Sequence, residues 1–170
     1  MKLRLWRAWL SEDARRTIIA AAERAHPNET GGVLVGVLNR RRPWITEAIE
    51  LPSPASNGTC YLLDGEARRA AVEAAQTQVP AVGYLGEWHS HPTDVGPSTT
   101  DLATMKRLAN DPDSGTRRPL LLIARRTGTT YRLDAREVSR LGHRPLRLVA
   151  AGTLAIDSVL SSPTMNSRVG

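Results

Sequence analysis

Three stretches of the chain place hydrophobic residues at the three- and four-residue spacing of a helix that buries one side. Each stretch follows a residue whose side chain can cap a helix N-terminus, and these residues are Ser11, Asp64 and Ser98. The first helix is expected to end at His26-Pro27, because the residue before a proline disfavours the helical conformation. The pattern therefore predicts three helices, the second of them rich in alanine.

Between these helices, short apolar runs bounded by turn residues predict strands. The run VLVGVL within residues 32–39 is typical of a buried strand. The expected strands cover residues 2–9, 32–39, 44–51, 61–63, 82–88, 120–124 and 129–133, with residues 144–150 as a last strand or a short helix. Strands that alternate with helices indicate an α/β fold, a single domain with a mixed β-sheet flanked by helices.

Two polar, turn-rich segments, residues 52–59 and 110–118, are expected to be loops. The chain has 170 residues, which fits one domain, and no internal repeat or domain boundary is visible. We therefore expect one domain over residues 1–150 and a C-terminal extension over residues 151–170 that is partly disordered.

Composition narrows the class of protein. Hydrophobic residues make up 41% and charged residues 24% of the chain, as in ordinary globular proteins. No apolar run approaches the roughly 20 residues that cross a bilayer, and the N-terminus lacks the apolar core of a signal peptide. Cys60 is the only cysteine, so it cannot form an internal disulfide. These features predict a cytoplasmic protein that does not enter a membrane.

The net charge of +6 is a reason to consider nucleic-acid binding. The basic residues are nearly all arginines and are scattered, with Arg40-Arg41-Arg42 as the longest run, in an expected hairpin turn. No stretch interleaves basic and aromatic residues in the manner of single-strand-binding surfaces. The pattern therefore argues against nucleic acid as the main partner.

The segment from Gly86 to Asp101 carries the strongest chemical signal. His89 and His91 are one residue apart at the end of an expected strand, so their imidazoles point to the same face. Asp101 lies in the first turn of the next expected helix and can add a carboxylate oxygen. Three protein ligands and an open fourth position are typical of catalytic zinc, which lowers the pKa of a bound water to about 7. The motif predicts Zn²⁺ on His89, His91 and Asp101.

Each part of this motif also has a structural explanation. Ser98 and Asp101 form the S-x-x-D pattern of a capping box, and a lone H-x-H pair is weak evidence for a metal. The combination of these patterns with the Pro-Ser turn between them favours a metal site. The other two histidines, His26 and His143, stand beside turn residues without a ligand pattern and are expected at the surface or at caps.

A second cluster, Glu29-Thr30-Gly31-Gly32, leads into the buried strand. Glu29 offers a carboxylate that can move a proton from the attacking water to the leaving amine. Without the histidine motif, Glu29 would be better explained as a solvated glutamate in the turn before a strand. The hydroxyl of Ser98 can meet the negative charge that develops on the substrate. Glu29 and Ser98 are therefore the candidate catalytic residues.

The pairing of E-x-G-G-x-L-x-G with the downstream motifs H-S-H-P and P-S-x-x-D resembles the JAMM (MPN-type) zinc metalloprotease family over about residues 1–150. The stretch YLGEW before the histidines is similar, more narrowly, to bacterial JAMM proteins of ubiquitin-like conjugation operons, including antiphage ones. The resemblance implies a cytidine-deaminase-like architecture. It also implies roles for five residues: zinc ligands at His89, His91 and Asp101, a general base and acid at Glu29, and an oxyanion-stabilising group at Ser98.

The spacing between the second histidine and the aspartate departs from the family pattern. Nine residues separate His91 from Asp101, one fewer than is usual. The P-S-x-x-D unit is intact, so the missing residue falls within residues 93–96, where Gly96 allows the turn to adapt. Asp94 is the alternative third ligand.

The function implied by the resemblance is hydrolysis of the bond after the C-terminal glycine tail of a ubiquitin-like modifier, in deconjugation or precursor processing. The partners implied are the modifier or its conjugates, and conjugation enzymes from the same operon. Residues 52–59 and 110–118 are expected to flank a groove for the tail. Arg117 and Arg118 are expected to attract an acidic face of the modifier.

Three other functions fit parts of the pattern. The main alternative is a non-catalytic MPN-type scaffold or interaction protein, but such relatives typically lack the zinc ligands, which are all present here. A DNA-repair-associated relative would carry an H-N-H-P-S-G motif, which is absent. A cell-wall or tail-assembly peptidase is disfavoured because no second hydrolase domain accompanies this one.

Overall fold

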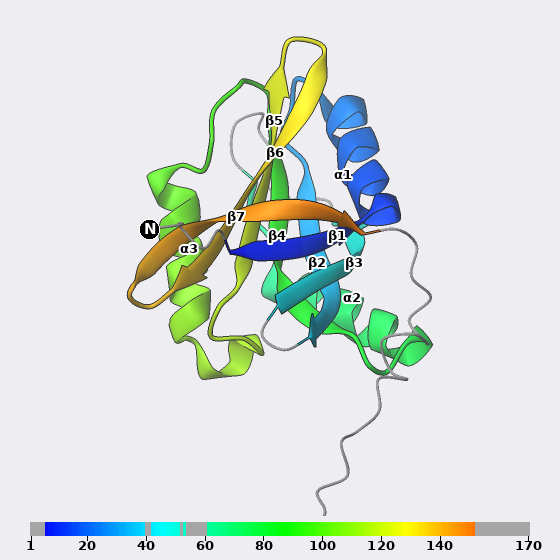
Figure 1. The fold of residues 1–170 in the computed structure, drawn as a ribbon, viewed down its shortest axis with the longest axis vertical. Helices are drawn as coiled ribbons and strands as arrows, with labels where there is room; N and C mark the ends of the chain where they lie inside the picture. The colour runs from blue at the N-terminus through cyan, green and yellow to red at the C-terminus, as the bar shows by residue number, and fades with distance from the viewer. Residues whose placement is uncertain (1–5, 40–41, 52, 54–60, 152–170) are drawn as a thin grey trace, which may run out of the picture.

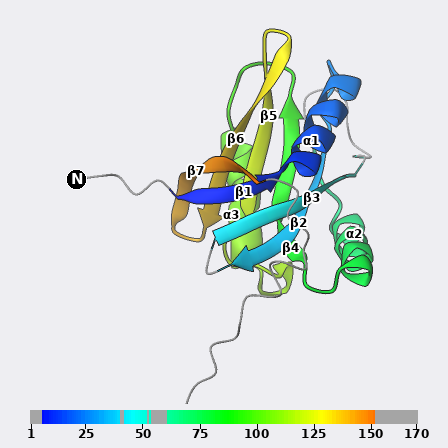
Figure 2. The same ribbon diagram turned by 45° about the vertical axis from the view of Figure 1, so that its right-hand side comes forward.

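The computed structural model describes residues 6–39, 42–51, 53 and 61–151 (Figure 1). In order along the chain, the elements are β1 (Arg7–Ser11), α1 (Glu12–Ala25), β2 (Gly31–Asn39), β3 (Arg42–Glu50), α2 (Gly65–Gln78), β4 (Gly83–His91), α3 (Thr99–Asn110), the short 3-10 helix η1 (Pro112–Ser114), β5 (Leu120–Thr127), β6 (Thr130–Ser139) and β7 (Gly142–Ala151). Figures 1 and 2 show the three α-helices at separate places around the sheet.

The sheet closes on itself. Its strand order, β1-β3-β2-β4-β5-β6-β7, returns to β1, which pairs in parallel with both β3 and β7. The strands β4 and β5 form the other parallel pair, and the remaining pairs are antiparallel. The predicted α/β class and mixed sheet are confirmed. The expected layer flanked by helices is instead a closed barrel, because β1 bridges the two edges of the sheet.

The strands β2, β4 and β5 are buried on both faces over most of their length, which explains their nearly continuous apolar runs. In β2, Leu34 packs in the core that includes Ile18 of α1, whereas Val33 and Val35 pack against Ala75 of α2. The strand β5 divides its apolar side chains in the same manner between α1 and α3. One face of the sheet is therefore covered by α1, and the other is shared by α2 and α3.

The predicted helix starts are confirmed. The side chains of Ser11, Asp64 and Ser98 cap α1, α2 and α3, each by accepting a backbone N–H from the first turn. The first helix ends at Ala25, directly before His26. Of the described helices, none combines the length and the apolar character that crossing a bilayer requires.

Some local expectations change. Residues 61–63 form no strand, the loop at residues 110–118 contains η1, and residues 144–150 belong to the strand β7. The first strand begins at Arg7 and not at residue 2. Residues 2–5, the arginine turn at residues 40–41, Cys60, residues 152–170 and, apart from Ser53, the expected loop at residues 52–59 lie outside the described residues.

A bulge in β4 decides which side chains of this strand face α2 and α3. The register between β2 and β4 shifts by one residue next to Gly86. A β-carbon at Gly86 would lie 2.0 Å from a main-chain oxygen of β5, so only glycine fits there. In consequence, Leu85 and Trp88, three residues apart, both belong to the core beside α1. His89 and His91 then face the opposite side.

Candidate metal centre

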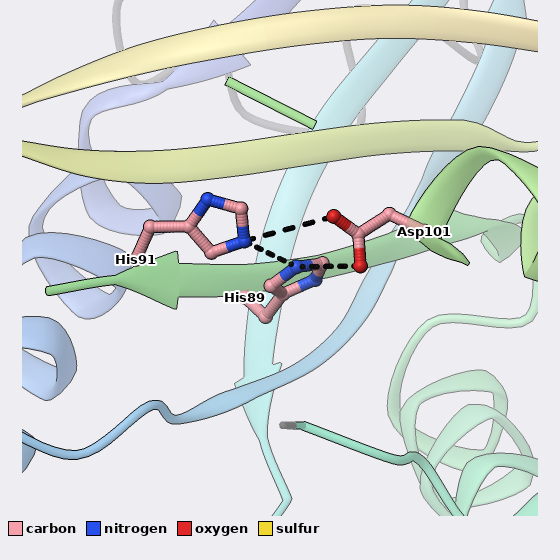
Figure 3. Close-up of side chains that lie close together, drawn as sticks. All are labelled: His89, His91 and Asp101. Carbon is pink, nitrogen blue, oxygen red and sulfur yellow. Dashed lines mark hydrogen bonds and ion pairs between the residues drawn. The ribbon is translucent and has the colours of Figure 1, made fainter. Parts of the chain in front are cut away.

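The end of β4 brings His89 and His91 to one face of the sheet, as the one-residue spacing predicts (Figure 3). Both residues are buried, and their Nε2 atoms are 3.1 Å apart. Both nitrogens also face the carboxylate of Asp101 (Figure 3). The two imidazoles therefore form two corners of a candidate metal centre.

Asp101 supplies the third corner from the first turn of α3. Its Oδ1 lies 3.3 Å from Nε2 of His89, and its Oδ2 lies 3.6 Å from Nε2 of His91. A tetrahedral zinc with bonds of about 2.0–2.1 Å holds its ligand atoms about 3.3 Å apart. The three side chains are therefore spaced as such an ion requires. Within the described part of the chain, they are the only group of three or more potential ligands close enough to share a metal.

Asp101 also completes the capping box of α3. The Ser98 N–H donates to Oδ2 of Asp101 at 2.6 Å, and the Asp101 N–H donates to Oγ of Ser98 at 3.1 Å. Burial raises the pKa of Asp101, but hydrogen bonds from His89 and from Ser98 outweigh it and hold that pKa below its ordinary value. The structural and the metal-binding explanations of S-x-x-D hold together, because the cap fixes the carboxylate that faces the histidines.

Contacts outside this triangle orient the two rings. Nδ1 of His91 lies 3.0 Å from the carbonyl oxygen of Val95. A carbonyl can only accept, so Nδ1 carries the proton and Nε2 keeps a lone pair for a metal. The ring of Tyr61 stacks beside His89 with an interplanar angle of 18°. These contacts therefore hold the Nε2 atoms of both rings toward the position that a metal ion would take between the three side chains.

The cavity at this triangle has a volume of about 670 Å³ and is also lined by Glu29 and Ser98. The structure thus brings all five residues singled out in the sequence to one cavity. Its other walls come from α3, from residues 61–63 and from the start of α2. A carboxylate and a hydroxyl beside a candidate metal centre are the groups that hydrolysis of an amide needs.

Ser90, which the sequence reasoning did not single out, ties the glutamate segment to the histidine strand. Its Oγ accepts the N–H of Thr30 at 3.0 Å, and its own N–H donates to the carbonyl of Thr30 at 2.7 Å. A β-carbon at Gly31 would lie 2.4 Å from the carbonyl of Trp88, so the two strands approach closely here. These contacts fix the position of the chain next to Glu29.

Glu87 is a second residue that the sequence reasoning missed. It is 8% exposed and lines the cavity, two residues before His89. Its Oε1 is 3.3 Å from NH1 of Arg68 and 3.4 Å from the hydroxyl of Tyr84. Burial raises the pKa of Glu87 even though Arg68 opposes that shift. The signal was available, because E-W-H-S-H places three polar side chains at alternate positions of a strand.

The loop between the histidines and α3 is held by Asp94, the alternative third ligand. Its Oδ1 lies 3.1 Å from Nε of Arg125 on β5, and Asp94 is not part of the group that can share a metal. The expected flanking by residues 110–118 is wrong for this cavity, which none of them lines. Arg118 lines a separate cavity and pairs with Glu137 at 3.1 Å.

A closed mixed sheet with a His-x-His strand and an aspartate at the next helix start defines a domain that carries the ligand set of a metallohydrolase. The chain belongs to the family described as prokaryotic homologues of the JAB domain, whose profile matches residues 11–138. This confirms the resemblance to JAMM and MPN proteins seen in the sequence.

The proteins to which the chain is similar include two relatives and one solved structure. It is 28% identical over 143 residues to a CD-NTase/cGAS isopeptidase of Enterobacter hormaechei, covering 82% of this chain and 78% of the relative. It is 26% identical over 120 residues to the probable metalloprotease y4qB of Sinorhizobium fredii, covering 68% of this chain and 73% of the relative. The solution structure of protein DSY2949 from Desulfitobacterium hafniense matches with a TM-score of 0.71 and 23% identity over 88% of this chain and 96% of that one, which supports the fold.

Proposed function

We propose that this protein is a zinc-dependent isopeptidase or peptidase that hydrolyses the bond after the glycine-ended tail of a ubiquitin-like modifier. One observation carries the proposal: His89, His91 and Asp101 converge at tetrahedral spacing in a cavity that Glu29 and Ser98 also line. Three ligands leave one position of a zinc ion for water or substrate, as in catalytic zinc sites.

The chain's own residues divide the chemistry among themselves. Zinc, when bound, supplies a Lewis acid that acidifies water and polarises a carbonyl. Glu29 takes the proton of the attacking water and delivers it to the leaving amine. The Ser98 oxygen accepts the Asp101 N–H in the helix cap, which leaves its O–H free to donate to the developing oxyanion.

The substrate class is supported by the family and by one relative's name. The E. hormaechei protein that is similar to this chain is named an isopeptidase, and the S. fredii protein a probable metalloprotease. Isopeptidases act on a bond to a lysine side chain, which fits modifier deconjugation. By the same reasoning, we propose the conjugates of such a modifier and its conjugation enzymes as partners, in the cytoplasm and in an antiphage setting.

The test is a panel of ubiquitin-like domains fused through their C-termini to a reporter, differing only in the two residues before the cut. We expect cleavage of Gly-Gly fusions that stops with a chelator, returns with zinc, and is lost in Glu29→Gln. Equal cleavage of Gly-Gly and Leu-Leu fusions would show a general peptidase. If zinc-loaded protein binds conjugates but does not cleave them, the protein is instead a non-catalytic scaffold.

A further inference from the structure

The cavity contains a charged pair that the catalytic scheme does not use. Glu87 lies on the same face of β4 as His89, two residues earlier, and Arg68 reaches it from the first turns of α2. Both side chains line the cavity, and they are 11% and 18% exposed. A buried ion pair in the wall of a catalytic cavity needs an explanation, because removing charges from water is costly.

The hydrogen bonding of Glu87 is incomplete. Both of its hydrogen-bond partners, the Arg68 guanidinium and the Tyr84 hydroxyl, reach Oε1, at 3.3 and 3.4 Å. Among the described residues, no group donates a hydrogen bond to Oε2. Arg68 is held over the ring of Tyr84, 5.4 Å from its centroid. The pair is thus fixed in place, with one carboxylate oxygen available to a donor in the cavity.

The chemistry of the pair favours a neutral dipolar ligand. The charges of Arg68 and Glu87 cancel, so a free cation or anion gains little from the pair as a whole. A peptide group presents an N–H donor and a C=O acceptor, which complement a carboxylate and a guanidinium. Strand geometry places Glu87 about 6.6–6.8 Å from His89 along β4, which is the length of two residues of an extended peptide.

We propose that Arg68 and Glu87 form a subsite for the substrate backbone, in which Oε2 of Glu87 accepts a peptide N–H and Arg68 donates to a neighbouring carbonyl. The bound peptide group lies about two residues from the scissile carbonyl. This subsite deepens the proposed function and rests on it for the peptide nature of the ligand. It recognises the main chain, so it tolerates different side chains but rejects a proline or an N-methylated residue at that position.

The experiment uses a fluorescent peptide, Ala-Leu-Ala-Leu-Gly-Gly joined to lysine, and a series in which one amide at a time is replaced by an ester. An ester removes the N–H and weakens the adjacent carbonyl as an acceptor. Binding to zinc-loaded Glu29→Gln protein is measured by anisotropy, so that no cleavage is required. We expect one ester, about two residues from the lysine linkage, to weaken binding about tenfold or more, the usual effect of losing a hydrogen bond to a charged group.

The same series is then measured with Glu87→Gln or Arg68→Met added. We expect both changes to remove the sensitivity to that one ester, while Glu137→Gln, an equally buried glutamate outside this cavity, leaves it intact. If each ester weakens binding by the same factor in the mutant as in the parent protein, at every position of the peptide, the subsite is wrong. Because binding and fusion cleavage are separate readouts, coupled binding without cleavage would reject the proposed function alone, and cleavage without coupling would reject the subsite alone.

Discussion

Glu87 and Glu137 are both buried glutamates with arginine partners, but they lie in different parts of the molecule. Glu137, on β6, accepts from Arg118 at 3.1 Å and from Arg144 at 2.6 Å. Arg144 is in turn stacked on the ring of Trp6 at 3.4 Å. Glu87 has one arginine and a tyrosine at longer distances. In both clusters the two donors reach Oε1, but Glu137 has two charged donors at short distances, whereas Glu87 has one charged donor and a hydroxyl at longer distances.

The difference separates a structural region from a binding region. Short charge-assisted bonds from two arginines join β6 to β7 and to the segment before β5, so the Glu137 cluster holds barrel strands together. Among the described residues, no second arginine joins the Glu87 cluster to another barrel strand, and the cluster lines the cavity of the candidate metal centre. Equal burial of the same residue type therefore does not mean an equal role. The charge and distance of the donors, and the position of Glu87 beside the candidate metal centre, distinguish the two carboxylates.

The largest expected effect comes from removing one of the three candidate metal ligands that line the cavity. In His89→Ala the triangle loses one of three donors, so we expect zinc content to fall well below one ion per chain and cleavage to fall to background. Elemental analysis of purified protein and the fusion assay measure both. A variant that keeps one zinc and normal turnover would exclude His89 as a ligand.

Glu29→Gln separates chemistry from metal binding in the same cavity. We expect a loss of turnover of about 10²–10⁴-fold, typical of removing a general base, with zinc content and melting temperature unchanged. Single-turnover kinetics on the Gly-Gly fusion provide the measurement. Near-normal activity in metal-loaded protein would remove Glu29 from the mechanism.

Glu137→Gln tests the structural half of the comparison. Two arginines lose the negative charge of their shared partner, so we expect the free energy of unfolding to fall by about 1–3 kcal/mol, less than for a fully buried pair because Arg118 is 63% exposed. Urea denaturation measures this change, while zinc content and turnover should match the wild type. If turnover falls and stability does not, the assignment of this cluster to structure is wrong.

Ser98→Ala is expected to lower the free energy of unfolding by about 1 kcal/mol, the usual effect of a lost helix cap. Because the cap also fixes Asp101, we expect weaker zinc binding, and a further loss of turnover at saturating zinc from the missing oxyanion donor. Thermal melts, zinc titration and turnover separate these contributions. Ser98→Asp restores a cap without a hydroxyl and serves as the matched control: recovery of turnover in this variant would mean that the hydroxyl only caps the helix.

Local signals in the sequence predicted the features that depend on neighbouring residues. The capping residues Ser11, Asp64 and Ser98 marked the helix starts, because a cap is satisfied within one turn. The alternation of a strand placed His89 and His91 on one face. Both predictions rest on distances of a few residues, which the chain specifies directly.

Features that depend on distant pairing could not be predicted in the same manner. Closure of the barrel needs β1 to meet β7, and no local pattern encodes that partner. The role of Asp94 depends on Arg125, which approaches only because β5 lies parallel to β4. Residues 110–118 were assigned to the groove from their polarity, but their position is set by the packing of α3 and β5.

The double pairing of β1 has a consequence for how the protein is made. Synthesis begins at the N-terminus, so β1 emerges early, yet its longer pairing, from Arg7↔Arg147 to Ser11↔Ala151, involves a strand that emerges more than a hundred residues later. Until then, β1 has only the two-residue pairing of Trp9 and Leu10 with β3. Before β7 is made, the barrel is therefore an open sheet with two exposed edges, and the last of the described strands to be translated is the one that closes it.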